Sequence, residues 1–99
     1  MAQLTKKVKE TAIREAAKNG VPVSVLLAIW QAESGFDVLA LGDLNADNAA
    51  YSYGIGQLHV KGAGGGIHPR KLLILEVNAA MSAGFLGRCF KAFPQDRNL

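Results

Sequence analysis

The chain has 99 residues, which is enough for one small domain with a single hydrophobic core. Hydrophobic residues make up 49% of it and charged residues only 19%, and this balance is typical of a globular protein and excludes a disordered one. The single cysteine, Cys89, excludes a scaffold built on internal disulfides, and we expect it to be a small core residue. The net charge of +3 favours an anionic partner, either nucleic acid or the bacterial cell wall.

Apolar periodicity predicts four helical segments. The first has an apolar residue at every fourth position from Leu4 to Ala16 and ends at Gly20. Prolines stand where the second and third segments can begin, at Pro22 and Pro69. The predicted ranges are 3–18, 22–34, 69–74 and 76–93.

The last of these segments carries one stripe of apolar and small residues, which we expect to face the core. Leu86 and Phe90 broaden this stripe. Its members are Val77, Met81, Gly84, Phe85, Cys89 and Phe93.

Residues 37–66 lack regular periodicity and are rich in Gly, Asn, Asp and Ala. About thirty irregular residues inside a compact domain are unusual and indicate either disorder or a functional loop. The middle part, residues 51–60, is too apolar and aromatic to be disordered, so we expect an ordered Gly-rich loop with a turn of helix or a short hairpin. The predicted fold is therefore mainly α, one domain over residues 1–99 with a long ordered central loop.

Glu33 is the residue best suited to chemistry. In a helix it falls on the same side as Leu26, Ile29 and Trp30, and it lies in the last turn, where the helix dipole disfavours a negative charge. Both effects favour the protonated carboxyl that a general acid needs to cleave a glycosidic bond. An equally good interpretation is that Glu33 is an ordinary residue at the helix end, whose side chain points to solvent. We expect Trp30 to be a core residue.

Several motifs in order along the chain resemble one known family. Glu33-Ser34-Gly35-Phe36 is followed in the central loop by Ser52-Tyr53-Gly54-Ile55-Gly56-Gln57-Leu58. Residues 17–23 precede the first motif, and Asn78 with Ala83-Gly84-Phe85-Leu86 follows in the last helix. This set resembles the goose-type lysozymes and the soluble lytic transglycosylases, over roughly residues 10–93.

The resemblance implies a small lysozyme-like helical domain that cleaves the β-1,4 bond between N-acetylmuramic acid and N-acetylglucosamine in peptidoglycan, without a cofactor. It implies that Glu33 protonates the glycosidic oxygen. In transglycosylases the same carboxylate then takes a proton from the 6-hydroxyl of the sugar, which leaves a 1,6-anhydro end. For Tyr51 and Tyr53, packing the loop onto the core is as good an interpretation as sugar binding. Gln57 would contact the sugar or hold the loop, and Gly54 and Gly56 would let the backbone approach the glycan closely. The implied substrate-binding residues are Ser34, Tyr51, Tyr53, Gly54, Ile55, Gln57 and Asn78.

A second carboxylate would distinguish hydrolysis from transglycosylation. Gly42-Asp43 resembles a Gly-Asp pair of goose-type lysozymes, whose Asp helps to position water, and inverting hydrolases need such a second carboxylate. Asp43 is therefore the second candidate catalytic residue, with Asp47 as its alternative, although both residues also suit turns. The stretch from Asp43 begins like a calcium loop but lacks Gly at its sixth position and Glu at its twelfth, so we expect no metal.

Because of two departures from the family, the choice between hydrolysis and transglycosylation stays open. The chain lacks the Ala-Tyr-Asn-Ala-Gly motif that follows the long helix in the family, and Gly35 stands where goose-type enzymes have His. The first alternative function is a peptidoglycan-binding module with little turnover. Less favoured is a helical interaction protein, because it would leave the motifs at Glu33 and Gln57 unexplained. A small basic DNA-binding protein is also less favoured, because the central loop is too long for a helix-turn-helix and no helix concentrates basic residues on one face.

The expected partner is the glycan strand of peptidoglycan, and we expect no nucleic acid. The protein would be a monomer or part of a larger assembly. The apolar run over residues 21–30 is too short to span a membrane. No apolar stretch of a signal peptide follows the N-terminal lysines, so we expect synthesis in the cytoplasm and action on the cell wall, as in phage lysis, in a virion, or after release by another route. His59 and His68 are not required, and we expect surface or loop-packing roles for both.

Overall fold

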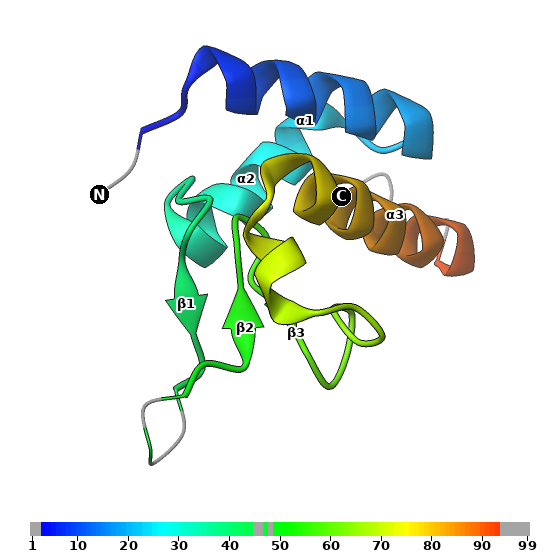
Figure 1. The fold of residues 1–99 in the computed structure, drawn as a ribbon. Coiled ribbons are helices and arrows are strands. Elements are labelled where there is room, and N and C mark those ends of the chain that lie inside the picture. Colours follow the sequence, from blue (N-terminus) through cyan, green and yellow to red (C-terminus); the bar gives the residue numbers. More distant parts are fainter. Residues whose placement is uncertain (1–2, 45–46, 48, 94–99) are drawn as a thin grey trace.

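The computed structural model describes residues 3–44, 47 and 49–93, and in these the domain is mainly α, as predicted. Figure 1 shows the three α-helices together, with two of the strands extending away from α1. A 3-10 helix, η1, precedes α3. The helices are α1 (Lys6–Asn19), α2 (Val23–Ser34), η1 (Pro69–Leu73) and α3 (Leu75–Ala92).

Helix α1 begins three residues later than the predicted start at residue 3. The reason is Thr5, whose Oγ accepts a hydrogen bond from the Val8 amide at 3.1 Å and so caps the helix. Leu4 therefore lies before the helix and is exposed. Gly20 ends the helix in the left-handed conformation, at φ +66°. The rest of the predicted stripe is confirmed, because Val8, Ala12 and Ala16 are all buried.

Helix α2 supplies the largest core side chain. Trp30 is fully buried, as predicted, and its indole N–H donates to Ser82 Oγ on α3 at 3.1 Å. Leu26 is buried on the same helix. Gly35 ends the helix, at φ +61°, with its amide bonded to the Gln31 carbonyl.

The prediction that this stripe of α3 faces the core is wrong. Phe85 is 46% exposed and Phe93 is 55% exposed. Small residues face the core instead because α3 packs closely on α1: a Cβ at Gly87 would lie 2.8 Å from the Asn19 carbonyl oxygen. Larger side chains do not fit at such a contact, and they lie at its edges. Leu86 and Phe90 are partly buried against the core, and Cys89 is half-buried. The buried residues of α3 are Leu75, Asn78, Ala79, Ser82, Ala83 and Gly87.

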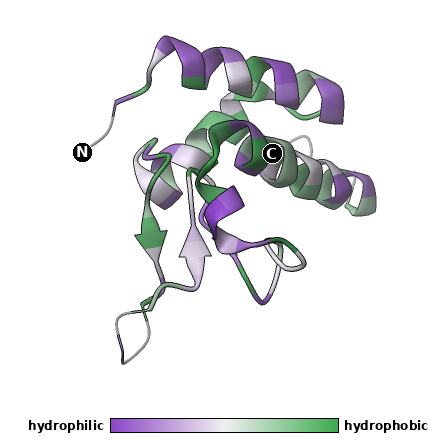
Figure 2. Cartoon of the chain, in the orientation of Figure 1, coloured by the Kyte–Doolittle hydropathy of each residue, from purple (hydrophilic) through white to green (hydrophobic). Residues whose placement is uncertain are grey.

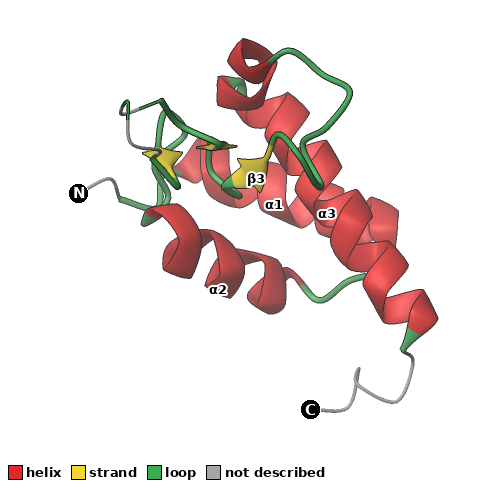
Figure 3. Ribbon diagram, turned by 90° about the horizontal axis from the view of Figure 1, so that it is seen from below, coloured by secondary structure: helices red, strands yellow, loops and turns green. Residues whose placement is uncertain are grey.

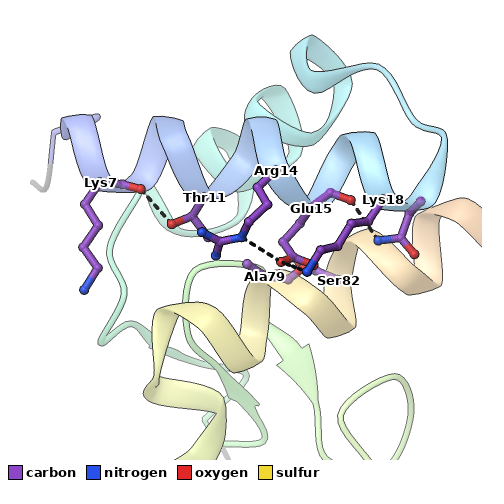
Figure 4. Close-up of polar contacts among 8 residues, drawn as sticks. Lys7, Thr11, Arg14, Glu15, Lys18, Ala79 and Ser82 are labelled. Atoms are coloured by element: carbon purple, nitrogen blue, oxygen red, sulfur yellow. Dashed lines mark hydrogen bonds and ion pairs between the residues drawn. The ribbon is translucent and has the colours of Figure 1, made fainter.

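One carboxylate is buried on α1. The side chain of Glu15 is 8% exposed, and its Oε2 lies 3.3 Å from Arg14 Nε and 3.5 Å from Lys18 Nζ. Figure 4 shows the Glu15 side chain extending from α1 between these two side chains. Both cations are at least half exposed, so they reach the buried charge from the surface and compensate it.

Figure 2 shows the purple outer face of α1 and the mostly green α2 that it covers.

The stretch 37–66, predicted as a loop, contains a three-stranded antiparallel sheet of order β1-β2-β3. The strands are β1 (Leu41–Gly42), β2 (Ser52–Tyr53) and β3 (Leu58–His59). Strands β2 and β3 form a hairpin within residues 51–60. Figure 3 shows how short the strands are beside the helices. A strand of two residues offers no alternation of apolar and polar positions, so periodicity does not reveal it.

In the part of the chain that the structure describes, no helix has the length and apolar character needed to cross a membrane.

Candidate functional site

Glu33 lies at a pocket of about 310 Å³ that is formed by α2, the β2–β3 hairpin and α3. Segments far apart in the sequence thus meet at the residue that the sequence identifies as the candidate acid. Most of the lining side chains are apolar. The lining residues are Leu26, Ile29, Glu33, Gly56, Gln57, Leu58, His59, Ala63, Ser82, Phe85 and Leu86.

Glu33 occupies the last turn of α2 and is exposed. Leu26 and Ile29 line the pocket beside it, as their shared helix face predicts, whereas Trp30 lies behind them in the core. Within residues 3–44, 47 and 49–93, no basic side chain forms an ion pair with Glu33. The carboxylate is therefore open to a ligand in the pocket.

Ser34 joins α2 to the hairpin. Its Oγ lies 2.7 Å from the Ile55 carbonyl oxygen and 3.1 Å from the Trp30 carbonyl oxygen. A hydroxyl has one proton to donate, and Ile55 is the nearer acceptor. Ser34 was predicted to bind substrate, and in the structure its hydroxyl fixes the hairpin next to Glu33.

Asn78 holds the hairpin from the side of α3. Its Nδ2 donates to the carbonyl oxygens of Tyr53 and Leu72, both at 2.9 Å. Its Oδ1 accepts from the Gly56 amide at 3.1 Å. The side chain is 0% exposed, so Asn78, predicted to bind substrate, acts in this structure by positioning the pocket wall.

Two glycines of the hairpin make room for Asn78. Gly54 has φ +81°, and a Cβ there would collide with the Leu72 carbonyl and with Asn78 Nδ2. A Cβ at Gly56 would lie 2.8 Å from Asn78 Oδ1. The family resemblance implied that the glycan approaches the backbone at these glycines, whereas the buried Gly54 admits Asn78 instead. Ile55, also predicted to bind substrate, is fully buried and belongs to the core.

Gln57 connects the hairpin to β1 and lines the pocket. Its Nε2 donates to the carbonyl oxygens of Ala40 and Gly54, both at 3.0 Å. Its backbone has φ +48°, in the left-handed region. A Cβ at Gly42 would collide with Gln57 Oε1, which explains the glycine in β1.

The two tyrosines lie beside the pocket rather than among its lining residues. The Tyr51 ring stacks on His59, with centroids 5.6 Å apart and an interplanar angle of 19°, and Lys61 Nζ lies 4.9 Å from the Tyr51 centroid. The Tyr53 hydroxyl donates to the Ala50 carbonyl at 2.9 Å. These contacts favour the interpretation of both tyrosines as anchors of the hairpin.

Sequence reasoning missed His59, which lines the pocket. Local pattern gave no signal for it, because Gln57 lies in the turn before β3, at φ +48°, so strand alternation does not relate the two residues. His68 lies outside the pocket and is exposed, and its Nδ1 accepts from the Arg70 amide at the start of η1.

The second candidate carboxylate, Asp43, is not part of the pocket lining. Asp43 is exposed, has φ +53°, and accepts a hydrogen bond from the Ser52 hydroxyl. Asp47 is exposed as well. The calcium-like stretch includes residues 45–46, which lie outside the described residues. Among the residues that are described, no group of three or more His, Cys, Asp or Glu side chains could hold a metal ion.

A larger hollow, of about 450 Å³, lies between the C-terminal parts of α1 and α3. The charged side chains that line it are Lys18, Arg88 and Lys91. Because it contains no carboxyl group, it cannot supply a general acid of the Glu33 kind. A second hollow of about 450 Å³, lined by Ala80, Met81 and Arg88 of α3 among others, has no carboxyl group among its described lining residues either. The Glu33 pocket is therefore the candidate active site.

No protein-family model, curated protein or solved structure matches the chain. What the pocket does must therefore follow from its own residues.

Proposed function

We propose that this protein is a muramidase of lysozyme-like fold that cleaves the β-1,4 bond between N-acetylmuramic acid and N-acetylglucosamine in peptidoglycan, with Glu33 as general acid. One observation carries the proposal: Glu33 from α2 and Gln57 from the hairpin line one pocket. These residues belong to the two motifs that resemble the transglycosylases and goose-type lysozymes.

The pocket suits a sugar in its size and its lining. Its volume of about 310 Å³ is at the lower end of the roughly 300–1,000 Å³ of small-molecule sites. Ile29, Phe85 and Leu86, which are exposed or partly buried, offer apolar surface to the faces of a sugar ring, while Glu33 and Gln57 supply polar groups at the edge. No cofactor is needed for this chemistry.

The reaction begins when the Glu33 carboxyl gives its proton to the glycosidic oxygen, and the bond from that oxygen to C1 of N-acetylmuramic acid breaks. The Glu33 carboxylate then takes the proton of the 6-hydroxyl of the same sugar. The 6-oxygen attacks C1 and closes a 1,6-anhydro ring. Glu33 ends protonated, as it began.

Transglycosylation is the favoured route because it needs one carboxylate. Glu33 is the carboxylate among the described lining residues, and Asp43 lies outside them. Hydrolysis is the second route, and it would require Asp43 or Asp47 to hold a water molecule on the opposite side of the sugar.

The test compares the clearing of a suspension of purified peptidoglycan by the wild type, by Glu33→Gln and by Glu10→Gln. Glu10 is an exposed residue of α1, so its variant matches the change in charge. We expect Glu33→Gln to clear at least about a hundredfold more slowly, since a general acid contributes roughly 10²–10⁴-fold, and Glu10→Gln to behave as the wild type. Equal clearing by Glu33→Gln would disprove the assignment. Binding to peptidoglycan without clearing would make the protein a binding module.

The proposed setting is the bacterial cell wall, reached during phage lysis, from a virion, or by release through another route. The proposed partner is the glycan strand. A DNA-binding protein would instead retard DNA in a gel, with an affinity that falls steeply as salt rises.

A further inference from the structure

His59 presents two ring nitrogens with different surroundings. Nδ1 accepts a hydrogen bond from the Lys61 amide at 3.1 Å, so this nitrogen carries no proton. In the neutral ring the proton is therefore on Nε2. No hydrogen bond joins Nε2 to any residue within the described ranges. His59 thus holds a donor that the fold does not use.

Contacts on several sides fix the orientation of this ring. Tyr51 stacks on it at 5.6 Å, and His59 pairs with Ser52 across the sheet. The Nδ1 bond to the Lys61 amide restricts rotation about the side-chain bonds. A donor that is fixed before a ligand arrives loses little conformational freedom on binding.

Apart from the protonated carboxyl of Glu33, the other side-chain donors of the pocket are committed to the protein itself. Both protons of Gln57 Nε2 go to the carbonyl oxygens of Ala40 and Gly54. Ser82 Oγ accepts from Trp30 Nε1 and donates to the Ala79 carbonyl at 3.4 Å. Of the donor-bearing side chains that line the described pocket, His59 is the one with an uncommitted N–H group.

We propose that His59 is a substrate-binding residue, whose Nε2–H donates to an acceptor oxygen, a hydroxyl or carbonyl, of the sugar bound beside Glu33. This inference rests on the proposed function. It requires the neutral ring, because Nδ1 must keep accepting from the Lys61 amide. It also gives the Tyr51–His59 stack a role, since the stack holds the donating ring in place.

The first test follows the imidazole nitrogens of the Glu33→Gln variant by NMR during titration with a β-1,4-linked trimer of N-acetylglucosamine, which this variant should bind without cleaving. His68 is an internal control, because its Nδ1 accepts from an amide two residues on, as in His59, but it lies outside the pocket. We expect both histidines to show the Nε2–H tautomer. We expect the trimer to shift the Nε2 signal of His59 and not that of His68.

The outcomes separate the two claims. If the backbone amides of residues 54–58 shift and His59 Nε2 does not, the glycan site stands and the role of His59 is overturned. If no signal near the pocket shifts at saturating trimer, both the inference and the proposed function are contradicted.

A second test removes the donor and keeps a flat ring. His59→Phe preserves a ring that can stack on Tyr51, and we expect its affinity for the trimer to fall about three- to tenfold, as for loss of one hydrogen bond. His68→Phe should bind as the wild type. Circular dichroism verifies that both variants are folded. Unchanged affinity of a folded His59→Phe would overturn the proposal.

Discussion

The helices and the sheet region of this domain are held by different kinds of contact. Where α1 meets α3, many of the buried residues are small and apolar, such as Ala12, Ala16, Ala79 and Ala83. The hairpin is held instead by side-chain hydrogen bonds to backbone groups, from Ser34, Gln57 and Asn78. Apolar packing is spread over many atoms, whereas each of these polar side chains bonds to specific backbone groups, and a buried group that loses its partner is costly.

The pocket lies where these two regions meet, since α2 and α3 provide one part of it and the hairpin the other. The comparison therefore predicts two classes of variant. Changes in the helical core should lower stability first. Changes in the hydrogen bonds of the hairpin should lower activity more than stability.

The largest loss of stability is expected for Trp30→Ala. Trp30 is fully buried, and removing a buried aromatic costs about 3–5 kcal/mol, out of a typical total of roughly 5–15 kcal/mol for a domain. Denaturation by urea, monitored by circular dichroism, measures this change. Phe93→Ala is the control, because it also removes an aromatic ring but from an exposed site, and we expect a change within about 0.5 kcal/mol. Equal losses would contradict the placement of the core.

Asn78→Ala should give the next largest effect. It leaves the Gly56 amide and the carbonyls of Tyr53 and Leu72 without their partner, and we expect a loss of about 2–4 kcal/mol, from roughly 1–3 kcal/mol for each buried unpaired group. Clearing of peptidoglycan should be lost, while the helical signal persists below the unfolding transition.

Asn19→Ala is the matched control for Asn78→Ala. Asn19 is half-buried, and its side-chain amide donates to the Glu15 carbonyl within α1. We expect this variant to keep its activity. If Asn78→Ala retained full activity, the hydrogen bonds of Asn78 would not be what positions the hairpin.

Ser34→Ala should cost less stability and still lower activity. It removes one hydrogen bond to Ile55, worth about 0.5–1.5 kcal/mol, but that bond joins the hairpin to the turn that carries Glu33. We expect the turnover rate to fall by more than the loss of folded protein explains. Ser24→Ala, at an exposed position of the same helix, should change neither quantity. A loss of activity that merely tracks unfolding would contradict the positioning role of Ser34.

Glu76→Gln should give the smallest effect, and that effect should depend on pH. The pKa of Glu76 is lowered from its ordinary value of 4.5, first by a hydrogen bond from its own backbone amide at the start of α3 and then by Lys7, whose Nζ lies 3.3 Å away. A lowered pKa in the folded state means that the charged group stabilises the fold above the unfolded pKa and stops doing so as pH falls through the folded pKa.

The melting temperature of Glu76→Gln should therefore be lower than that of the wild type at pH 7 by about 1 °C, as for an exposed ion pair. The difference should disappear on acidification below pH 4.5. A difference that grows on acidification would contradict the direction of the pKa shift.

The helical region is also the part that the sequence predicts well. Periodicity and capping residues identify α2 to within one residue and place Trp30 in the core. Periodicity fails on α3, where it selects Phe85 and Phe93 as buried. Apolarity alone does not show that α1 approaches so closely that Gly87 is required, because that contact depends on both helices together.

The site is predicted less completely than the helices. Glu33 was identified from its helix face and then from a motif, Gln57 was identified from a motif, and both line one pocket. The positioning roles of Ser34 and Asn78 were not predicted. A motif shows which residues belong to a site, but it does not show whether their side chains face the ligand or bond to the backbone. The bonds of Ser34 to Ile55 and of Asn78 to Tyr53 join residues 21 and 25 positions apart, and neither pairing follows from local pattern.

The most direct test of the central claim is the mass of the fragments that the wild type releases from purified peptidoglycan. The account predicts glycan fragments that end at N-acetylmuramic acid and are lighter by one water, as the 1,6-anhydro ring requires. Fragments with reducing ends would mean that the reaction is hydrolysis and not transglycosylation. Glu33 would remain the proposed acid, and Asp43 would be the next residue to mutate. Fragments cut in the peptide stems, or no fragments from correctly folded protein, would contradict the claim that this pocket cleaves the glycan.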